Sequence, residues 1–361
     1  DQRAEALFWL ANAYPDSALQ PILDAIREPY ALADDARAEP LGNGHINETV
    51  LVRSGARRLV AQRVNTAMFR DPGVLVHNAR LIEKRLEDKP GSLRVVRHLP
   101  GADGRFLHGP DGDVRVLEYV ADSRSIEVLE TVDQAYRAAR AFARFSGQLA
   151  DFDHAAMKTV IPDFHSPALR WRQFLDALQA DRVGRAAACL PEIEFALSTQ
   201  QAIEGWQRLM EELPRRVCHN DCKINNLLVH RRSGEPLAVI DLDTCMPGAV
   251  LPDFGDLVRT CCSPEPEDST RLDAVVARPD VYRSLHRGYT EGWGGALGRA
   301  ELEALPEAGR MMSFVLGLRM LTDHLDGDRY FAVSRPNHNL DRARNQFRLH
   351  GSLDELSVGA T

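Results

Sequence analysis

Three oxygen-bearing side chains in the second half of the chain are suited to joint chemistry: Asp221, Asn226 and Asp241. Magnesium prefers oxygen ligands and usually takes one or two from the protein, the others coming from phosphates and water. Asn226 and Asp241 suit such an ion, and Asp221 is then available to accept a hydrogen bond from an attacking hydroxyl. The set would serve transfer of a phosphoryl group from a magnesium-bound nucleotide to an alcohol.

The sequence between these residues predicts a hairpin that brings them together. Residues 227–229 and 237–240 are apolar runs of strand length, and residues 231–234 have the composition of a turn. An antiparallel hairpin places its two open ends side by side. Asn226 enters the first strand and Asp241 leaves the second, so both should lie at one end of the hairpin, with Asp221 in the loop just before it.

The spacing of these residues is typical of protein-kinase-like enzymes. An H-x-D-x-x-x-x-N loop followed by a strand and an aspartate forms the catalytic loop and metal site of that fold. His219, Asp221 and Asn226 fit the loop, and Asp241 fits the metal position. We expect His219 to organise the loop rather than to carry protons. No A-P-E-like element follows Asp241, which argues against a serine or threonine protein kinase.

The remaining elements divide the chain into a sheet-rich and a helical part. Strands are predicted at residues 48–53, 58–64, 93–99 and 114–120, with a helix at 72–86 and helical spacing over 5–27 that is broken near Tyr14 and Pro15. Further helices are predicted at 132–149, 167–178, 192–213, 281–289 and 311–325. The pattern predicts an α+β, protein-kinase-like, two-lobed fold, with a β-rich N-terminal lobe (1–120) and a mainly helical C-terminal lobe (121–361).

Composition limits the class of protein. The chain has 361 residues, of which 44% are hydrophobic and 27% charged, with a net charge of −8. This suits a globular protein of two domains and argues against a nucleic-acid binder. No apolar run reaches the roughly 18 residues of a membrane helix. Six cysteines show no C-x-x-C pair, so we expect buried free thiols in a reducing compartment, the cytoplasm.

Beyond the catalytic loop, the chain resembles the aminoglycoside phosphotransferase and choline kinase family, and within it the bacterial N-acetylhexosamine 1-kinases. The stretches that carry the resemblance run in order along most of the chain. They are residues 42–47 (GNGHIN), 62–66, 181–189, 219–221, 241–244, 246–248, 253–256 and 326–331.

The resemblance implies an ATP- and Mg²⁺-dependent sugar kinase that phosphorylates the anomeric hydroxyl of N-acetylglucosamine or N-acetylgalactosamine. Asp221 would be the catalytic base and would contact the sugar, and Asn226 and Asp241 would be the magnesium ligands. The other sugar-contacting residues would be His45, Arg319 and Tyr330, although His45 could instead cap a turn and Arg319 could form a surface ion pair.

The same fold implies a nucleotide site in the N-terminal lobe. Backbone N–H groups around Gly42, Asn43 and Gly44 would cover the phosphates, since glycine permits close approach. Gln62 occupies the place of the phosphate-pairing lysine of protein kinases or the place beside it, and Arg63 is the nearby charge. This leaves the phosphate contact open. Adenine would lie against the linker that contains Glu118 and Val120, bonded through backbone groups.

Several alternatives remain open. The same chemistry could act on an aminoglycoside, choline or homoserine, or the chain could be a nucleotide-binding pseudokinase scaffold. Residues 319–350 contain six Arg and four Asp, so the acceptor side is not acidic and disfavours a polycation.

Asp243 could be a second metal ligand or could bind the loop backbone. Asp253 and Asp256 are expected to brace the catalytic loop, and a monomer is favoured.

Overall fold

The structure is a computed structural model that describes residues 16–42, 46–87, 89 and 93–358. The chain divides into two compact units, each considered by itself. The N-terminal unit contains residues 1–88 and 94–122, and the C-terminal unit contains residues 89–93 and 123–361.

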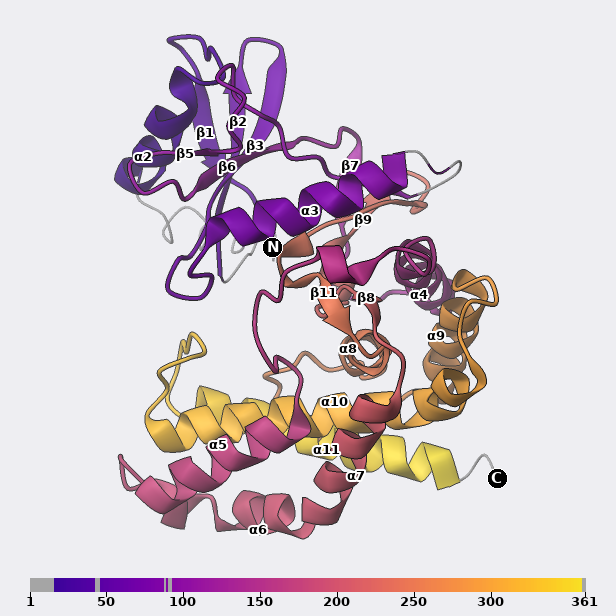
Figure 1. The fold of residues 1–361 in the computed structure, drawn as a ribbon. Coiled ribbons are helices and arrows are strands. Elements are labelled where there is room, and N and C mark those ends of the chain that lie inside the picture. Colours follow the sequence, from indigo (N-terminus) through magenta and orange to yellow (C-terminus); the bar gives the residue numbers. More distant parts are fainter. Residues whose placement is uncertain (1–15, 43–45, 88, 90–92, 359–361) are drawn as a thin grey trace. The chain divides into compact units, whose positions relative to one another are not determined.

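The N-terminal unit is built on an antiparallel sheet with the strand order β1-β2-β3-β6-β5 (Figure 1). The predicted strands at residues 48–53 and 58–64 and the helix at 72–86 are confirmed. In chain order the elements are α2 (Asp16–Arg27), β1 (Arg37–Pro40), β2 (Glu48–Ser54), β3 (Arg57–Arg63), α3 (Pro72–Glu87), β4 (Arg94–Val95), β5 (Leu107–His108) and β6 (Val114–Glu118).

Helix α2 covers one face of this sheet because its apolar residues recur at helical spacing. Leu19, Ile22, Leu23 and Ile26 form a stripe at i, i+3, i+4 and i+7, and all four are buried. Each such side chain contributes roughly 1.5–3 kcal/mol when it leaves water. The stripe packs on side chains that alternate along the central strands, namely Val50, Val52, Leu59, Ala61, Val114 and Val116. The residues between them therefore face the other side of the sheet.

The strand predicted at residues 93–99 is wrong in extent. Only Arg94–Val95 is a strand there. Farther along, the chain still follows β6, with Leu99 N donating to Val116 O (2.8 Å) and Glu118 N to Arg97 O (2.9 Å). Pro100 then removes a donor, so a regular ladder cannot continue.

The C-terminal unit is mostly helical, so the α+β class is confirmed. Its helices are α4 (Val132–Gly147), α5 (Pro167–Ala180), α6 (Leu190–Ser198), α7 (Gln200–Glu212), α8 (Leu251–Cys261), α9 (Pro279–Gly292), α10 (Arg299–Asp326) and α11 (His338–Val358). Its strands are β7 (Ser123–Ser125), β8 (Arg216–Cys218), β9 (Leu227–His230), β10 (Pro236–Val239) and β11 (Met246–Gly248). No helix in the described ranges is long and apolar enough to span a membrane.

Helix α10 is the centre of this unit and packs against α5, α8 and α11 (Figure 1). Its contact with α8 depends on Gly255. A Cβ at this position would lie 2.4 Å from the carbonyl oxygen of Ala308, closer than atoms can approach. Glycine therefore lets α8 lie directly on α10, which holds the N-terminal half of α8 under the catalytic loop.

Two helix predictions need correction. The single helix predicted at residues 192–213 is two helices, α6 and α7, which meet at Thr199. Thr199 bonds back to Phe195 O through its hydroxyl (3.0 Å) and ends α6. The helix predicted at 311–325 is the second half of α10, which begins at Arg299 and includes Pro306. Helix α11 was not predicted.

Candidate functional site

The predicted hairpin is confirmed, and it brings two of the predicted metal ligands to one end. Strands β9 and β10 pair antiparallel, with Leu227 opposite Val239. Just beyond this pair, Ile240 N donates to Asn226 O at 3.0 Å. Asn226 therefore lies across from the residue that precedes Asp241. Local strand pairing alone creates this meeting, so the short sequence pattern was sufficient to predict it.

Two neighbouring side chains, Asn226 and Lys223, bind the carboxylate of Asp221. Asn226 Nδ2 donates to the backbone oxygen of Asp221 (2.9 Å) and to its Oδ2 (3.0 Å). Lys223 Nζ lies 2.8 Å from the other carboxylate oxygen. Burial raises the pKa of Asp221, but the Lys223 ammonium, together with His219 and Arg259, outweighs burial and holds that pKa below its usual range. Asp221 is thus a fixed, ionised hydrogen-bond acceptor at neutral pH.

His219 organises the loop, as expected. Its side chain is fully buried, and the rings of Phe142 and Phe145 contact it edge-on. Its Nε2 lies 2.9 Å from Ile240 O, and its Nδ1 lies 3.3 Å from the N–H of Asp221. Because a carbonyl only accepts, Nε2 must carry the hydrogen, and Nδ1 accepts from Asp221. The ring therefore ties the catalytic loop to the end of β10.

The turn before Asp221 is held in a rare backbone conformation. Asn220 has φ of 62°, a left-handed value that Asn tolerates better than most residues. Its side chain donates to Thr244 O at 3.0 Å. The backbone N–H groups of His219 and Asn220 both donate to the Asp253 carboxylate, at 2.9 and 2.6 Å. The expectation that Asp253 braces the loop is therefore confirmed.

Asp253 is itself an unusual group, because only 1% of it is exposed. Burial raises its pKa to about 6, although the two backbone N–H groups and His219 favour the charged form. Asp256, also expected to brace the loop, accepts instead from Arg259 Nε at 3.0 Å. Arg259 also binds Glu267. Asp256 thus stabilises helix α8 rather than binding the loop directly.

Asn226 and Asp241 have the donor chemistry that magnesium requires. Both hydrogens of Asn226 Nδ2 go to Asp221, which leaves the amide oxygen Oδ1 for a cation. Asp241 is exposed, with φ of 60°, and precedes the 3₁₀ helix Leu242–Thr244. Across the described part of the chain, no three or more His, Cys, Asp or Glu side chains gather to hold a metal. Magnesium usually needs only one or two carboxylates besides phosphates and water, so this pair fits it.

Arg319 and Tyr330 are brought together, as the resemblance implies. Arg319 NH2 donates to the Tyr330 hydroxyl at 3.3 Å. The guanidinium also lies 5.5–5.6 Å from the ring centres of Phe164, Tyr330 and Phe331. Tyr330 is 52% exposed. Arg319 therefore forms a cation–π cluster rather than the surface ion pair considered as the alternative.

Asp323 holds the segment that carries Tyr330 in place through hydrogen bonds. The sequence alone did not single out this residue. Its carboxylate accepts the backbone N–H groups of Arg329, Tyr330 and Phe331 at 2.8–2.9 Å. It also accepts from Asn339 Nδ2 of α11 at 2.9 Å. One buried carboxylate thus orders three successive residues of the acceptor-side segment.

In the N-terminal unit, the structure separates Gln62 from Arg63. Gln62 Nε2 donates to Thr49 Oγ1 (2.9 Å), and Gln62 Oε1 accepts from Arg115. Arg63 lies on the opposite face of β3, where it pairs with Glu48 at 3.2 Å. Arg63 also lines a cavity of about 660 Å³ with residues of α2. Only Gln62 thus lies on the face that α2 leaves uncovered.

The other residues predicted to bind nucleotide are placed as follows. Gly42 has φ of 76°, which suits a glycine loop. Asn43, Gly44 and His45 lie outside the described residues. Glu118, at the end of β6, pairs through its side chain with Arg94 and Arg97, and its backbone N–H donates to Arg97 O. Val120 is buried.

The prediction of buried free thiols is confirmed. All six are free and buried. Burial raises the pKa of Cys218 and of Cys222 well above the usual thiol value. A thiol that stays protonated is a poor nucleophile, so the cysteines beside Asp221 fill space.

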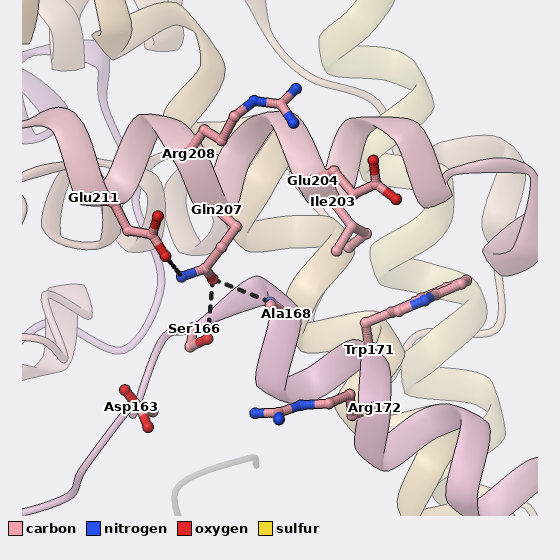
Figure 2. Close-up of a pocket in the computed structure, with 10 residues that line it drawn as sticks. All are labelled: Asp163, Ser166, Ala168, Trp171, Arg172, Ile203, Glu204, Gln207, Arg208 and Glu211. Atoms are coloured by element: carbon pink, nitrogen blue, oxygen red, sulfur yellow. Dashed lines mark hydrogen bonds between the residues drawn. The ribbon is translucent and has the colours of Figure 1, made fainter.

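A separate cavity of about 600 Å³ lies between α5 and α7 and is lined by none of the predicted site residues (Figure 2). Gln207 crosses it, and its Oε1 accepts from Ser166 Oγ and Ala168 N at 3.0 and 3.2 Å. Its Nε2 donates to Glu211. These polar groups form hydrogen bonds with one another across the two helices, so their role is structural. The lining residues are Asp163, Ser166, Ala168, Trp171, Arg172, Ile203, Glu204, Gln207, Arg208 and Glu211.

Residues 37–304 match the family model of the phosphotransferase enzyme family (APH), which is well over half of the chain. The protein therefore belongs to this family, whose members are small-molecule kinases with a protein-kinase-like fold. The conclusion agrees with the catalytic loop and hairpin described above.

Solved structures show the same fold at low sequence identity. The structure of a microcompartment-associated aminopropanol kinase matches with a TM-score of 0.63 and 20% identity, over 95% of this chain and 97% of that one. A spectinomycin phosphotransferase in complex with ADP and spectinomycin matches at 0.57 and 11%, over 93% and 98%. An ADP-bound aminoglycoside phosphotransferase matches at 0.53 and 14%, over 92% and 98%.

Proposed function

We propose that this protein transfers the γ-phosphoryl group of ATP to the anomeric hydroxyl of an N-acetylhexosamine and releases the sugar 1-phosphate. The observation that carries the proposal is Asp221, an ionised carboxylate fixed by Asn226 and Lys223 beside the hairpin end that presents Asp241. ATP as co-substrate is supported by family membership and by two similar structures that hold ADP.

Phosphoryl transfer depends mainly on positioning and charge, because its transition state is loose. Asp221 would accept the hydrogen bond of the attacking hydroxyl and take its proton late in the reaction. An anomeric hydroxyl is more acidic than an ordinary alcohol, so the lowered pKa of Asp221 is compatible with this role. Asn226 through Oδ1 and Asp241 through its carboxylate would hold Mg²⁺, whose chemistry there is neutralisation of phosphate charge.

A neutral acceptor is supported by the cluster around Arg319. Aromatic rings that surround an open space can bind a quaternary ammonium group, as choline would require. Here the rings of Phe164, Tyr330 and Phe331 surround the guanidinium of Arg319 instead. A cationic acceptor would meet a like charge there, whereas Arg319 and the Tyr330 hydroxyl can donate hydrogen bonds to sugar oxygens. His45, which the resemblance also assigns to the sugar, lies outside the described residues.

The test is to mix the purified protein with Mg-ATP and a panel of acceptors, and to follow ADP release. The panel is N-acetylglucosamine, N-acetylgalactosamine, glucose, galactose, choline, homoserine and kanamycin. We expect turnover with the N-acetylhexosamines and a product whose phosphorus and proton NMR spectra show a sugar 1-phosphate. Turnover only with kanamycin, choline or homoserine would overturn the sugar substrate while leaving the kinase intact.

The role of Asp221 has its own test. Asp221→Ala should abolish turnover while leaving Mg-nucleotide binding mostly unchanged, because this residue acts on the acceptor hydroxyl. Asp241→Ala should lose both. Asp133→Ala is the matched control, since Asp133 is a mostly exposed aspartate at the start of α4. Near-normal turnover by Asp221→Ala would show that another group is the base.

A further inference from the structure

A row of three polar side chains crosses the middle of the N-terminal sheet on the face opposite α2. Thr49 of β2 is opposite Gln62 of β3, and Gln62 is opposite Arg115 of β6. Gln62 Nε2 donates to Thr49 Oγ1 at 2.9 Å. Arg115 donates through Nε and NH2 to Gln62 Oε1, at 3.0 and 2.8 Å. The row is therefore a continuous hydrogen-bonded chain across three strands.

The pairing with Arg115 fixes which way the Gln62 amide points. A guanidinium has donors only, so the atom that faces it must be the amide oxygen. Both N–H groups of Gln62 then point away from Arg115. One is given to Thr49, and among the described residues Nε2 has no second acceptor. Gln62 thus presents a donor rather than an acceptor on this face.

Arg115 also brings a positive charge to this position. Only 2% of Arg115 is exposed, although an arginine this deep carries a large cost of desolvation. Its Nε and NH2 groups both donate to the amide oxygen of Gln62. Thr49 belongs to the same row, and its backbone oxygen accepts from the N–H of Leu41 (3.0 Å). Leu41 is the residue directly before Gly42. The row of Thr49, Gln62 and Arg115 therefore lies one backbone hydrogen bond from the residue before Gly42.

In protein kinases a lysine on the third strand pairs with the nucleotide phosphates. Here that place holds Gln62, and Arg63 faces the other side of the sheet. We propose that Gln62 and Arg115 together replace this lysine: Gln62 Nε2 donates to a phosphate oxygen, while Arg115, a positioning residue, orients the amide. The inference rests on the proposed use of ATP, and it does not depend on which acceptor is phosphorylated.

The proposal predicts a loss of affinity that depends on phosphate. Affinities of the full chain for Mg-ADP and for adenosine would be measured by calorimetry. Gln62→Leu and Arg115→Met should each weaken ADP binding about 10- to 100-fold, the range expected for hydrogen bonds to charged groups, and should leave adenosine binding unchanged. A general structural defect would weaken both ligands equally.

A rescue and a control make the test specific. Gln62→Lys introduced into the Arg115→Met chain restores a lysine to the strand and should recover ADP affinity. Arg53→Met is the matched control, because Arg53 lies in the same sheet, exposed and paired with Glu39. It should bind both ligands as the unaltered protein does.

Two outcomes would overturn the proposal. Equal loss of ADP and adenosine affinity in Gln62→Leu, or ADP loss in Arg63→Met but not in Gln62→Leu, would remove the phosphate role of the pair while leaving the kinase function standing. Failure of the unaltered protein to bind Mg-ADP at all would instead overturn the nucleotide site, and this proposal with it.

Discussion

Replacing Asp253 by asparagine should nearly abolish activity without lowering stability at neutral pH. Asp253 accepts the backbone N–H groups of His219 and Asn220, and these two residues directly precede Asp221. In Asp253→Asn, one carboxylate oxygen becomes an NH2 group that faces an N–H donor. The loop must then move, and a displacement of about 1 Å at a reacting group can cost about 100-fold in rate. We therefore expect a kcat about 100-fold lower.

The effect on stability follows from the pKa of Asp253. Its folded pKa is about 6, roughly two units above the unfolded value, and each unit corresponds to about 1.4 kcal/mol. Because the folded pKa is the higher one, the native state binds the extra proton. Stability from this group is therefore fully present below pH 4 and is lost as the pH rises through 6. Ionised Asp253 thus costs about 3 kcal/mol at pH 8, a cost that asparagine does not carry.

The assay is urea unfolding of both proteins between pH 4 and pH 8. The free energy of unfolding of Asp253→Asn, relative to the unaltered protein, should rise by about 3 kcal/mol over this range. Asp133→Asn, an exposed aspartate paired with Arg137 on α4, should show no such change. A difference between Asp253→Asn and the unaltered protein that is independent of pH would refute the reasoning, since Asp253 would then be ionised throughout.

Three further outcomes are expected. Gly255→Ala places a methyl group 2.4 Å from the carbonyl oxygen of Ala308, so its free energy of unfolding should fall by about 3 kcal/mol, measured by denaturant unfolding. In Asp323→Asn, one of the two oxygens that accept backbone N–H groups from the segment with Tyr330 becomes an NH2 group. It should raise the KM for the acceptor about tenfold while leaving the KM for ATP unchanged, in steady-state kinetics. Ellman's reagent should label none of the buried thiols in the folded protein at pH 8 and all six after unfolding.

The sequence predicted the catalytic centre well because the information there is local. Asn226, the two strands and Asp241 lie within a short stretch whose apolar runs and turn allow few arrangements. The confirmed hydrogen bond between Ile240 and Asn226 is a direct result of that pairing. Lys223 was missed, although it lies two residues from Asp221. A signal existed in the sequence, since a cation so close to a predicted base must affect its pKa.

Partners that are distant in sequence could not be predicted in this way. Arg115 and Gln62 are 53 positions apart and meet only through the register of β3 and β6. Helix α11 was missed for a different reason. Asn339, Asn345 and Gln346 occupy buried positions on it, so its apolar stripe is interrupted by polar residues. Their partners lie on other elements, such as Asp323 for Asn339. A periodicity argument cannot see such pairs.

Asp221 of the catalytic loop and Asp253 of α8, which braces that loop, have pKa values shifted in opposite directions. Burial dominates at Asp253 and raises its pKa to about 6, whereas at Asp221 the surrounding positive charges, Lys223 first among them, together outweigh burial and lower the pKa. As the pH falls, Asp253 therefore takes up its proton first and loosens its hold on the loop. The fall of kcat/KM at low pH should then follow the protonation of Asp253, which holds the loop, and not the protonation of Asp221, the base.

This assignment predicts opposite shifts in two variants. In Asp253→Asn the residual activity should have an acid limb at lower pH, because only Asp221 then titrates. In Lys223→Met the main force that lowers the pKa of Asp221 is gone, and burial raises it, so the acid limb should move to higher pH. A limb that moves in the same direction in both variants, or in neither, would show that one group controls the profile and that the two carboxylates do not divide the roles in this way.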